Sequence, residues 1–191
     1  AAAIPMDAVF LGKLFAMLAV SWVGITVWGL AGSAVWLGAG NSLSNFPAPA
    51  VGWPLFFAFG VAYFSMGYLL LGSIFLAIGS LATTVREVQT LSMPVTMLQL
   101  LNFFFASYAM AKPGSVVETA AMIVPFSSPF MMLAKAAQDD TLWIHGATLA
   151  WQAVCVAVLV RGGAALFKKR VMKSGPAGTG RRGLFRRKAA A

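Results

Sequence analysis

Four long apolar stretches run along the chain, and shorter stretches rich in polar residues or proline separate them. They cover about residues 14–37, 54–81, 93–110 and 143–166. A helix rises about 1.5 Å per residue, so about 20 residues cross the roughly 30 Å hydrocarbon core of a bilayer. The pattern therefore predicts an all-α, polytopic membrane protein whose four transmembrane helices form a domain over residues 14–167.

Prolines interrupt the interval between the third and fourth apolar stretches. Pro113, Pro125 and Pro129 leave two pieces, 115–124 and 128–138, that are each too short to cross a membrane. Apolar pieces of this length are more often re-entrant or interfacial. We expect a re-entrant, external helix pair over about residues 115–138. The charged residues expected near the membrane surface there are Lys112, Glu118, Lys135, Asp139 and Asp140.

A short polar island, residues 81–94, separates the second apolar stretch from the third. It contains Arg86 next to Glu87 and predicts a loop that ends near Pro94, in the first turn of the third helix. Gln99 and Asn102 lie inside this third helix. Amide side chains in hydrocarbon require partners, so we expect the helix to turn them toward protein or a polar cavity. An interhelical hydrogen bond with no role in transport would also satisfy them.

The composition excludes a soluble domain. Hydrophobic residues make up 60% of the chain and charged residues 10%, with a mean hydropathy of +0.82, more apolar surface than one core of this size buries. The net charge of +9 comes from residues 168–191, since basic and acidic residues balance in residues 1–167. We interpret 168–191 as a basic, flexible tail that contacts membrane lipids, with no nucleic acid as partner.

The distribution of basic residues predicts the orientation. If the C-terminus is cytoplasmic, four spans place twelve of the fourteen Lys and Arg residues on the cytoplasmic side and only Lys112 and Lys135 outside. The opposite orientation would invert this bias. We expect a multi-pass cell membrane protein with the C-terminus and the polar island in the cytoplasm.

The sequence offers little from which to build a catalytic or metal site. It has one histidine, one cysteine and five carboxylates, and it lacks the common phosphate-loop, nucleophile-elbow and zinc motifs. We interpret His145 as a solvated interfacial side chain and Cys155 as a small buried one. We expect no catalytic residue, no metal site and no cofactor bound by this chain.

Three segments resemble type-2 ABC exporter permeases. Residues 4–14, with Pro5, Gly12 and Lys13, resemble the segment in which a cytoplasmic coupling helix leads into a transmembrane helix. Residues 72–94 resemble the family's next cytoplasmic turn, and residues 123–132 resemble its external loop before the last helix. The segments occur in the family's order and are closest to the NatB-like sodium or drug efflux branch. Ile4 stands where the family pattern usually has threonine.

The resemblance implies a six-helix permease of which this chain supplies the last four helices, so that the natural protein would start upstream of Ala1. Residues 1–13 would be the end of the coupling helix. The permease would export substrate across the cell inner membrane, driven by ATP and magnesium bound to a separate ABC ATPase subunit. It would also pair with a second permease half, identical or different.

The same resemblance suggests roles for individual residues. The residues expected to couple to the ATPase are Pro5, Met6, Gly12, Lys13, Arg86, Glu87 and Gln89. Those expected to form an external gate are Pro125, Ser128 and Pro129. The polar side chains expected to border a transport pathway are Gln99, Asn102, Ser107 and Tyr108.

Another class of protein would share this topology and basic tail. A non-transporting four-span membrane assembly or lipid-interacting scaffold protein would need no ATPase, so co-purification of an ATPase distinguishes the two. An intramembrane hydrolase is disfavoured, because no nucleophile and base are paired within the spans.

Overall fold

The computed structural model describes residues 5–40 and 47–173, and every regular element within these ranges is a helix. In chain order the helices are α1 (Met6–Gly38), α2 (Trp53–Leu81), α3 (Val85–Met110), α4 (Val116–Ile123), α5 (Ser128–Gln138) and α6 (Leu142–Lys173). Helices α1, α2, α3 and α6 are long and apolar enough to cross a membrane. The prediction of an all-α protein with four spans is confirmed.

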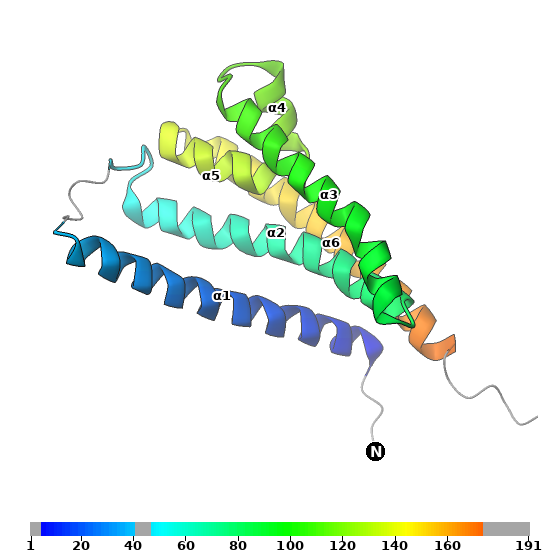
Figure 1. The fold of residues 1–191 in the computed structure, drawn as a ribbon. Coiled ribbons are helices and arrows are strands. Elements are labelled where there is room, and N and C mark those ends of the chain that lie inside the picture. The colour runs from blue at the N-terminus through cyan, green and yellow to red at the C-terminus, as the bar shows by residue number, and fades with distance from the viewer. Residues whose placement is uncertain (1–4, 41–46, 174–191) are drawn as a thin grey trace, which may run out of the picture.

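Helix α2 lies at the centre of the molecule. It packs along α6 and also contacts α5, α1 and α3. Figure 1 shows α1 and α2 running side by side, while α3 diverges from α2 toward the short helices α4 and α5. The beginning of α1, the turn between α2 and α3 and the end of α6 therefore lie at one end of the bundle, and α4 lies at the other.

The first helix is held by a stripe of buried side chains near its beginning. Phe10, Leu14 and Leu18 are spaced four residues apart, so they share one face of α1. Phe10 and Leu14 form a core cluster with Ala164 and Phe167 of α6. Helix α1 runs without a break through the expected boundary between residues 13 and 14, and this stripe lies on both sides of it.

Two glycines allow the helices to approach closely at this cluster. A Cβ atom added at Gly72 of α2 would lie 2.7 Å from Leu14 Cδ1. One added at Gly163 of α6 would lie 2.9 Å from Phe10 Cζ and 3.1 Å from the Ser73 carbonyl oxygen. Small residues at such crossings let backbones pack closely, as is common between membrane helices.

The polar island is mostly helical, which corrects the predicted loop. Only residues 82–84 lie between α2 and α3. The Thr84 hydroxyl accepts a hydrogen bond from Glu87 N at 3.2 Å, and Glu87 Oε2 accepts one from Thr83 N at 2.7 Å. This reciprocal capping starts α3 at Val85, because it satisfies backbone N–H groups that the first helical turn leaves free.

The early start of α3 also corrects the position of Pro94. This proline lies inside the helix, not in its first turn. A proline at an interior position removes one backbone hydrogen bond, yet α3 continues to Met110. Proline is tolerated within membrane helices, where neighbouring groups can satisfy the freed carbonyl.

Helix α6 extends beyond the predicted span. It continues to Lys173, so the first basic cluster of the expected tail is helical. Lysine and arginine are good helix formers, and such a helix end can extend into the polar interface. The remainder of the expected tail, residues 174–191, lies outside the described residues, as does part of the loop before α2.

The described part of that loop is attached to α5. Ala50 N donates a hydrogen bond to the Ala137 carbonyl at 3.0 Å, and Val51 N donates one to the Ala136 carbonyl at 3.3 Å. The last carbonyls of a helix have no partner within the helix. The segment that leads into α2 therefore satisfies the end of α5.

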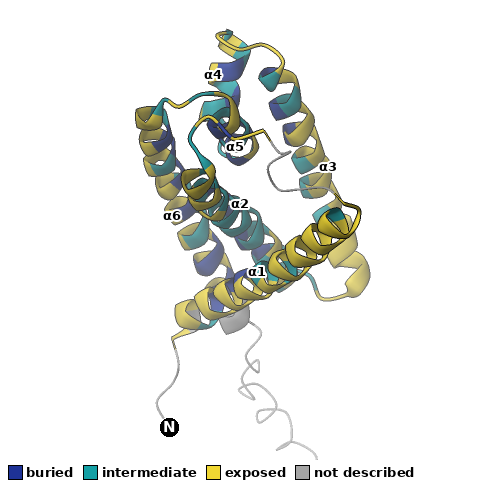
Figure 2. Ribbon diagram, turned by 90° about the vertical axis from the view of Figure 1, so that its left-hand side faces the viewer, coloured by how far each residue is buried: buried dark blue, intermediate teal, exposed yellow. Residues whose placement is uncertain are grey.

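Much of α1 and α3 is exposed, as the yellow parts of their ribbons in Figure 2 show, and many of the exposed side chains are apolar. Exposed side chains include Val20, Trp28 and Val35 on α1, and Leu101 and Phe104 on α3. Exposed apolar faces of this size are expected where a helix meets lipid or another membrane helix.

Candidate functional site

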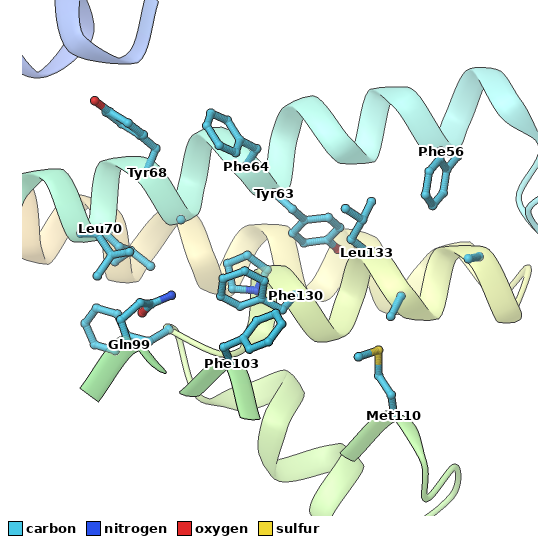
Figure 3. A pocket seen from close by; sticks show the side chains of 16 residues that line it. Phe56, Tyr63, Phe64, Tyr68, Leu70, Gln99, Phe103, Met110, Phe130 and Leu133 are labelled. Carbon is cyan, nitrogen blue, oxygen red and sulfur yellow. The ribbon is translucent and has the colours of Figure 1, made fainter. Parts of the chain in front are cut away.

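A hollow in the described structure lies between α2, α3 and α5. It is a pocket of about 500 Å³, and its described lining contains no charged residue. Figure 3 shows Gln99 and Phe103 of α3 on one side, Tyr63 and Leu70 of α2 on another, and Phe130 of α5 between them. This size is within the range typical of small-molecule sites.

Gln99 is the predicted pathway residue that lines this pocket. Its Oε1 atom is buried and accepts no hydrogen bond from the described residues. Gln99 thus lines a cavity that is apolar, whereas a polar one was predicted, and its place on a transport pathway stays a prediction.

The other three predicted pathway residues do not line the pocket. Asn102 is buried, and its Nδ2 donates to the Leu98 carbonyl of its own helix at 2.8 Å. Ser107 Oγ donates in the same way to the Phe103 carbonyl at 2.9 Å. Tyr108 is exposed and accepts a hydrogen bond from Lys112 Nζ. The structure therefore does not group these three residues with Gln99.

A second hollow, of about 390 Å³, adjoins the first. The two share Gln99, Phe103 and Phe130, so these three side chains stand between them. Phe75, Thr96 and Leu100 complete the lining of the second hollow, and Thr96 and Leu100 are exposed. The pocket thus continues toward the outer face of α3.

The predicted gate residues lie where α5 begins, and they contact two different helices. Pro129 is buried and lines the pocket, and a Cβ added at Gly67 of α2 would lie 3.3 Å from Pro129 Cγ. The Pro125 carbonyl accepts a hydrogen bond from Gln152 Nε2 of α6 at 2.8 Å. Ser128 is fully buried, and its Oγ has no partner among the described residues.

Two charged residues of the short helices form a largely buried ion pair. Lys135 Nζ of α5 lies 2.8 Å from Glu118 Oε1 of α4, and their side chains are 15% and 7% exposed. Glu118 Oε2 also accepts a hydrogen bond from Gly114 N. Asp139 lies 3.4 Å from the same ammonium group. Glu118 is thus buried within the protein, and these bonds compensate its burial. Its expected position near the membrane surface stays a prediction.

The ion pair shifts the pKa values of both partners, each in the direction that favours the charged form. The hydrogen bond from Lys135 lowers the pKa of the Glu118 carboxyl, and the bond from Gly114 acts in the same direction. The bond to Glu118 raises the pKa of Lys135. Hydrogen bonds from Thr141 lower the pKa of Asp139. All three groups are therefore held in their charged forms, and the pair joins α4 to α5.

His145 was predicted to be solvated, and the structure shows that it is buried. Its side chain is 1% exposed, and Tyr63 Oη lies 3.0 Å from His145 Nδ1. The imidazole ring also stacks on Phe59 with ring centroids 4.3 Å apart. A polar pair at this position joins α2 to α6.

These buried pairs are only partly foreshadowed by the amino-acid sequence. Glu118 and Lys135 are separated by a proline-containing turn, and Tyr63 and His145 lie on different helices. In contrast, Thr84 and Glu87 have the three-residue spacing of a capping box, a local signal from which the start of α3 could have been predicted.

The residues predicted to couple to an ATPase gather at one end of the bundle (Figure 1). Pro5, Gly12, Lys13, Arg86 and Gln89 are exposed there. Lys13 Nζ lies 5.9 Å from the centroid of the Phe167 ring. Glu87 serves as a capping residue, and it forms no ion pair with Arg86 in the described structure. Met6 begins α1, and its side chain lies outside the described residues.

No group of three or more His, Cys, Asp or Glu side chains suited to a metal ion occurs in the described ranges. The arrangement instead offers an apolar pocket, a buried ion pair and an exposed polar end.

Comparison with known proteins identifies the family. The family model for ABC-2 family transporter proteins matches residues 8–164. The chain therefore belongs to the ABC-2 transporter family, and it is a multi-pass membrane protein of the permease type.

Two curated relatives, both uncharacterised, are similar to parts of the chain. YhaP of Bacillus subtilis is 24% identical over 115 residues, which cover 60% of this chain and 27% of YhaP. MJ1024 of Methanocaldococcus jannaschii is 23% identical over 125 residues, which cover 65% of this chain and 29% of MJ1024. The chain thus spans less than a third of either relative. No solved structure matches it.

Proposed function

We propose that this chain is the C-terminal part of the permease subunit of an ABC exporter. It would move substrate outward, using ATP hydrolysed by a separate ATPase subunit, and would act with a second permease half. The observation that carries this proposal is the family match over residues 8–164, which includes most of the four candidate spans.

The distribution of charge supports a cytoplasmic C-terminus. Lys13, Arg86, Lys168 and Lys169 lie at the end of the bundle that holds the start of α1 and the end of α6. Lys112 and Lys135 belong to the segment around α4 and α5, toward the opposite end. The excess of basic residues at one end favours a cytoplasmic position for it.

The same end is the proposed docking surface for the ATPase. Arg86 and Gln89 are exposed near the beginning of α3, and Glu87 holds that beginning in place through its capping bonds. We assign docking to Arg86 and Gln89 and a supporting role to Glu87. An exposed charge pair contributes less than about 1 kcal/mol to stability, so stabilisation alone is a weak reason for Arg86.

The proposed pathway borders the pocket at Gln99, and the proposed external gate is the turn from Pro125 to Pro129. Because Pro129 packs against α2, movement of this turn would change the pocket directly. The NatB-like efflux branch is the proposed subgroup.

The gate is tested with Pro129→Leu. We expect this variant to impair export more than membrane insertion. Export with normal kinetics would contradict the assignment of this turn as the gate.

The docking proposal is tested with the full permease reconstituted with its ATPase. The Arg86→Ala/Gln89→Ala variant should lose most of the stimulation of ATP hydrolysis while still inserting normally. Thr119→Ala, an exposed change on α4, is the matched control and should retain stimulation. Unchanged stimulation in the double variant would overturn the docking surface.

The wider proposal depends on a partner ATPase. Co-purification of the full permease from its native membrane should recover an ABC ATPase in a fixed ratio. Recovery of the permease without any ATPase would favour a non-transporting scaffold protein.

A further inference from the structure

The pocket between α2, α3 and α5 combines an aromatic lining with one unused hydrogen-bond acceptor. Its described lining includes Phe56, Tyr63, Phe64, Phe103, Phe126 and Phe130. Aromatic rings prefer offset or edge contacts with other rings, and the existing Phe103 and Phe130 rings already meet edge to face at 5.6 Å. A lining of this kind favours an occupant that contains rings.

The acceptor is Gln99 Oε1. It is buried, and it has no hydrogen-bond partner among the described residues. A buried polar atom without a partner costs about 1–3 kcal/mol, so an occupant that donates to it gains affinity. A charged carboxylate is absent from the described lining, so the pocket offers little to balance a full positive charge.

The pocket also has a route to the surface. The adjoining hollow of about 390 Å³ shares Gln99, Phe103 and Phe130 with it and reaches exposed residues of α3. Figure 3 shows Gln99 and Phe103 next to each other at this side of the pocket. A ligand dissolved in the bilayer would reach the acceptor through this side opening without crossing water.

We propose that the pocket binds an uncharged, ring-containing apolar molecule that carries one hydrogen-bond donor, which it donates to Gln99 Oε1. The molecule enters from the membrane between α2 and α3. Gln99 selects for the donor, and the aromatic side chains bind the apolar body. This deepens the proposed permease function, on which it rests for the role of the ligand as substrate.

N-phenyl-1-naphthylamine is a suitable probe, because it has three aromatic rings and a single N–H donor and its fluorescence rises in apolar surroundings. Its N-methyl derivative has the same rings and no donor. Both are titrated against the full permease in nanodiscs without ATP, with protein-free nanodiscs as the blank. We expect saturable binding of the amine about tenfold tighter than that of its N-methyl derivative, the ratio that one hydrogen bond of about 1.4 kcal/mol gives.

Variants separate the hydrogen bond from the integrity of the fold. In Gln99→Leu the two probes should bind equally, with the N-methyl derivative bound as in the wild type. Gln138→Leu, an exposed glutamine at the end of α5 outside the pocket, should keep the full difference. Ala134→Leu, which fills part of the pocket, should weaken both probes.

Two results would overturn the proposal. One is the absence of saturable binding above the protein-free blank, as when another membrane helix occupies the pocket in the full permease. The other is an undiminished preference for the amine in Gln99→Leu. These titrations use no ATP, so an absence of binding would contradict the proposed binding site and not the proposed permease function. Binding of the probe without any ATP-driven export would contradict the permease function and not the binding site.

Discussion

Two buried polar side chains near α2, Tyr63 and Gln99, differ in whether they have a hydrogen-bond partner. On the side facing α6, the Tyr63 hydroxyl is hydrogen-bonded to His145 Nδ1 at 3.0 Å. On the side facing α3, Gln99 Oε1 has no partner among the described residues and borders an apolar hollow. Paired polar groups fix one helix arrangement, whereas an unpaired one leaves an interaction for a ligand. The Tyr63 hydroxyl therefore serves the fold, although its ring also lines the pocket, whereas the Gln99 oxygen is left for binding.

The largest effect is expected where a buried charge loses its partner. Lys135→Met leaves the Glu118 carboxylate buried beside α5 without its counter-ion. We expect a loss of about 2–3 kcal/mol in the free energy of unfolding, less than for a fully enclosed pair because water reaches part of Lys135. Thermal unfolding in detergent measures this loss. The Glu118→Leu/Lys135→Met double variant should recover much of it, and a double variant as unstable as the single one would contradict the pairing.

Acid should weaken the same pair by a smaller amount. The pKa of Glu118 is lowered in the folded protein, so its stabilising contribution is present above the ordinary pKa of a glutamate. The contribution is lost as the pH falls through the lowered folded pKa. The raised pKa of Lys135 acts at the other extreme, where its contribution is lost as the pH rises through the folded pKa. Melting temperatures measured against pH should therefore fall less steeply in acid for Glu118→Gln than for the wild type.

Removing the hydroxyl on the paired side of α2 should have a moderate effect. Tyr63→Phe leaves His145 Nδ1 without its bond in a site that is almost closed to solvent. The expected cost is about 1–2 kcal/mol. Equilibrium unfolding measured by tryptophan fluorescence tests it, with Tyr68→Phe as the control on the same helix. Equal stability of Tyr63→Phe and wild type would show that the pair contributes nothing.

The smallest effect on stability is expected at the unpaired side. Gln99→Leu removes a buried acceptor that has no described partner, so stability should stay unchanged or rise by up to about 1 kcal/mol. The same unfolding measurement applies. A marked loss of stability would mean that Gln99 is part of the structural framework, and the contrast between the two sides of α2 would then fail.

The spans and the two short helices were predictable because their signals are local. Long apolar stretches define α1, α2, α3 and α6, and the prolines bracket α4 and α5. The capping by Glu87 is also a local signal, but the many polar residues of the island led to the prediction of a loop there. The pairs Tyr63 with His145 and Glu118 with Lys135 depend on how distant segments pack, which composition and periodicity do not reveal. The same limit applies to the apolar surroundings of Gln99, since they come from three helices.

The attachment of the loop before α2 to the end of α5 has a consequence for biogenesis. Ala50 and Val51 leave the ribosome well before Ala136 and Ala137, whose carbonyls they bond. Until α5 is synthesised, the N–H groups of this segment remain hydrated and the entrance to α2 is unanchored. The segment before α2 therefore reaches its final position only after α5 has been made, so a chain halted within α5 should be more open to protease at residues 47–52 than the finished protein.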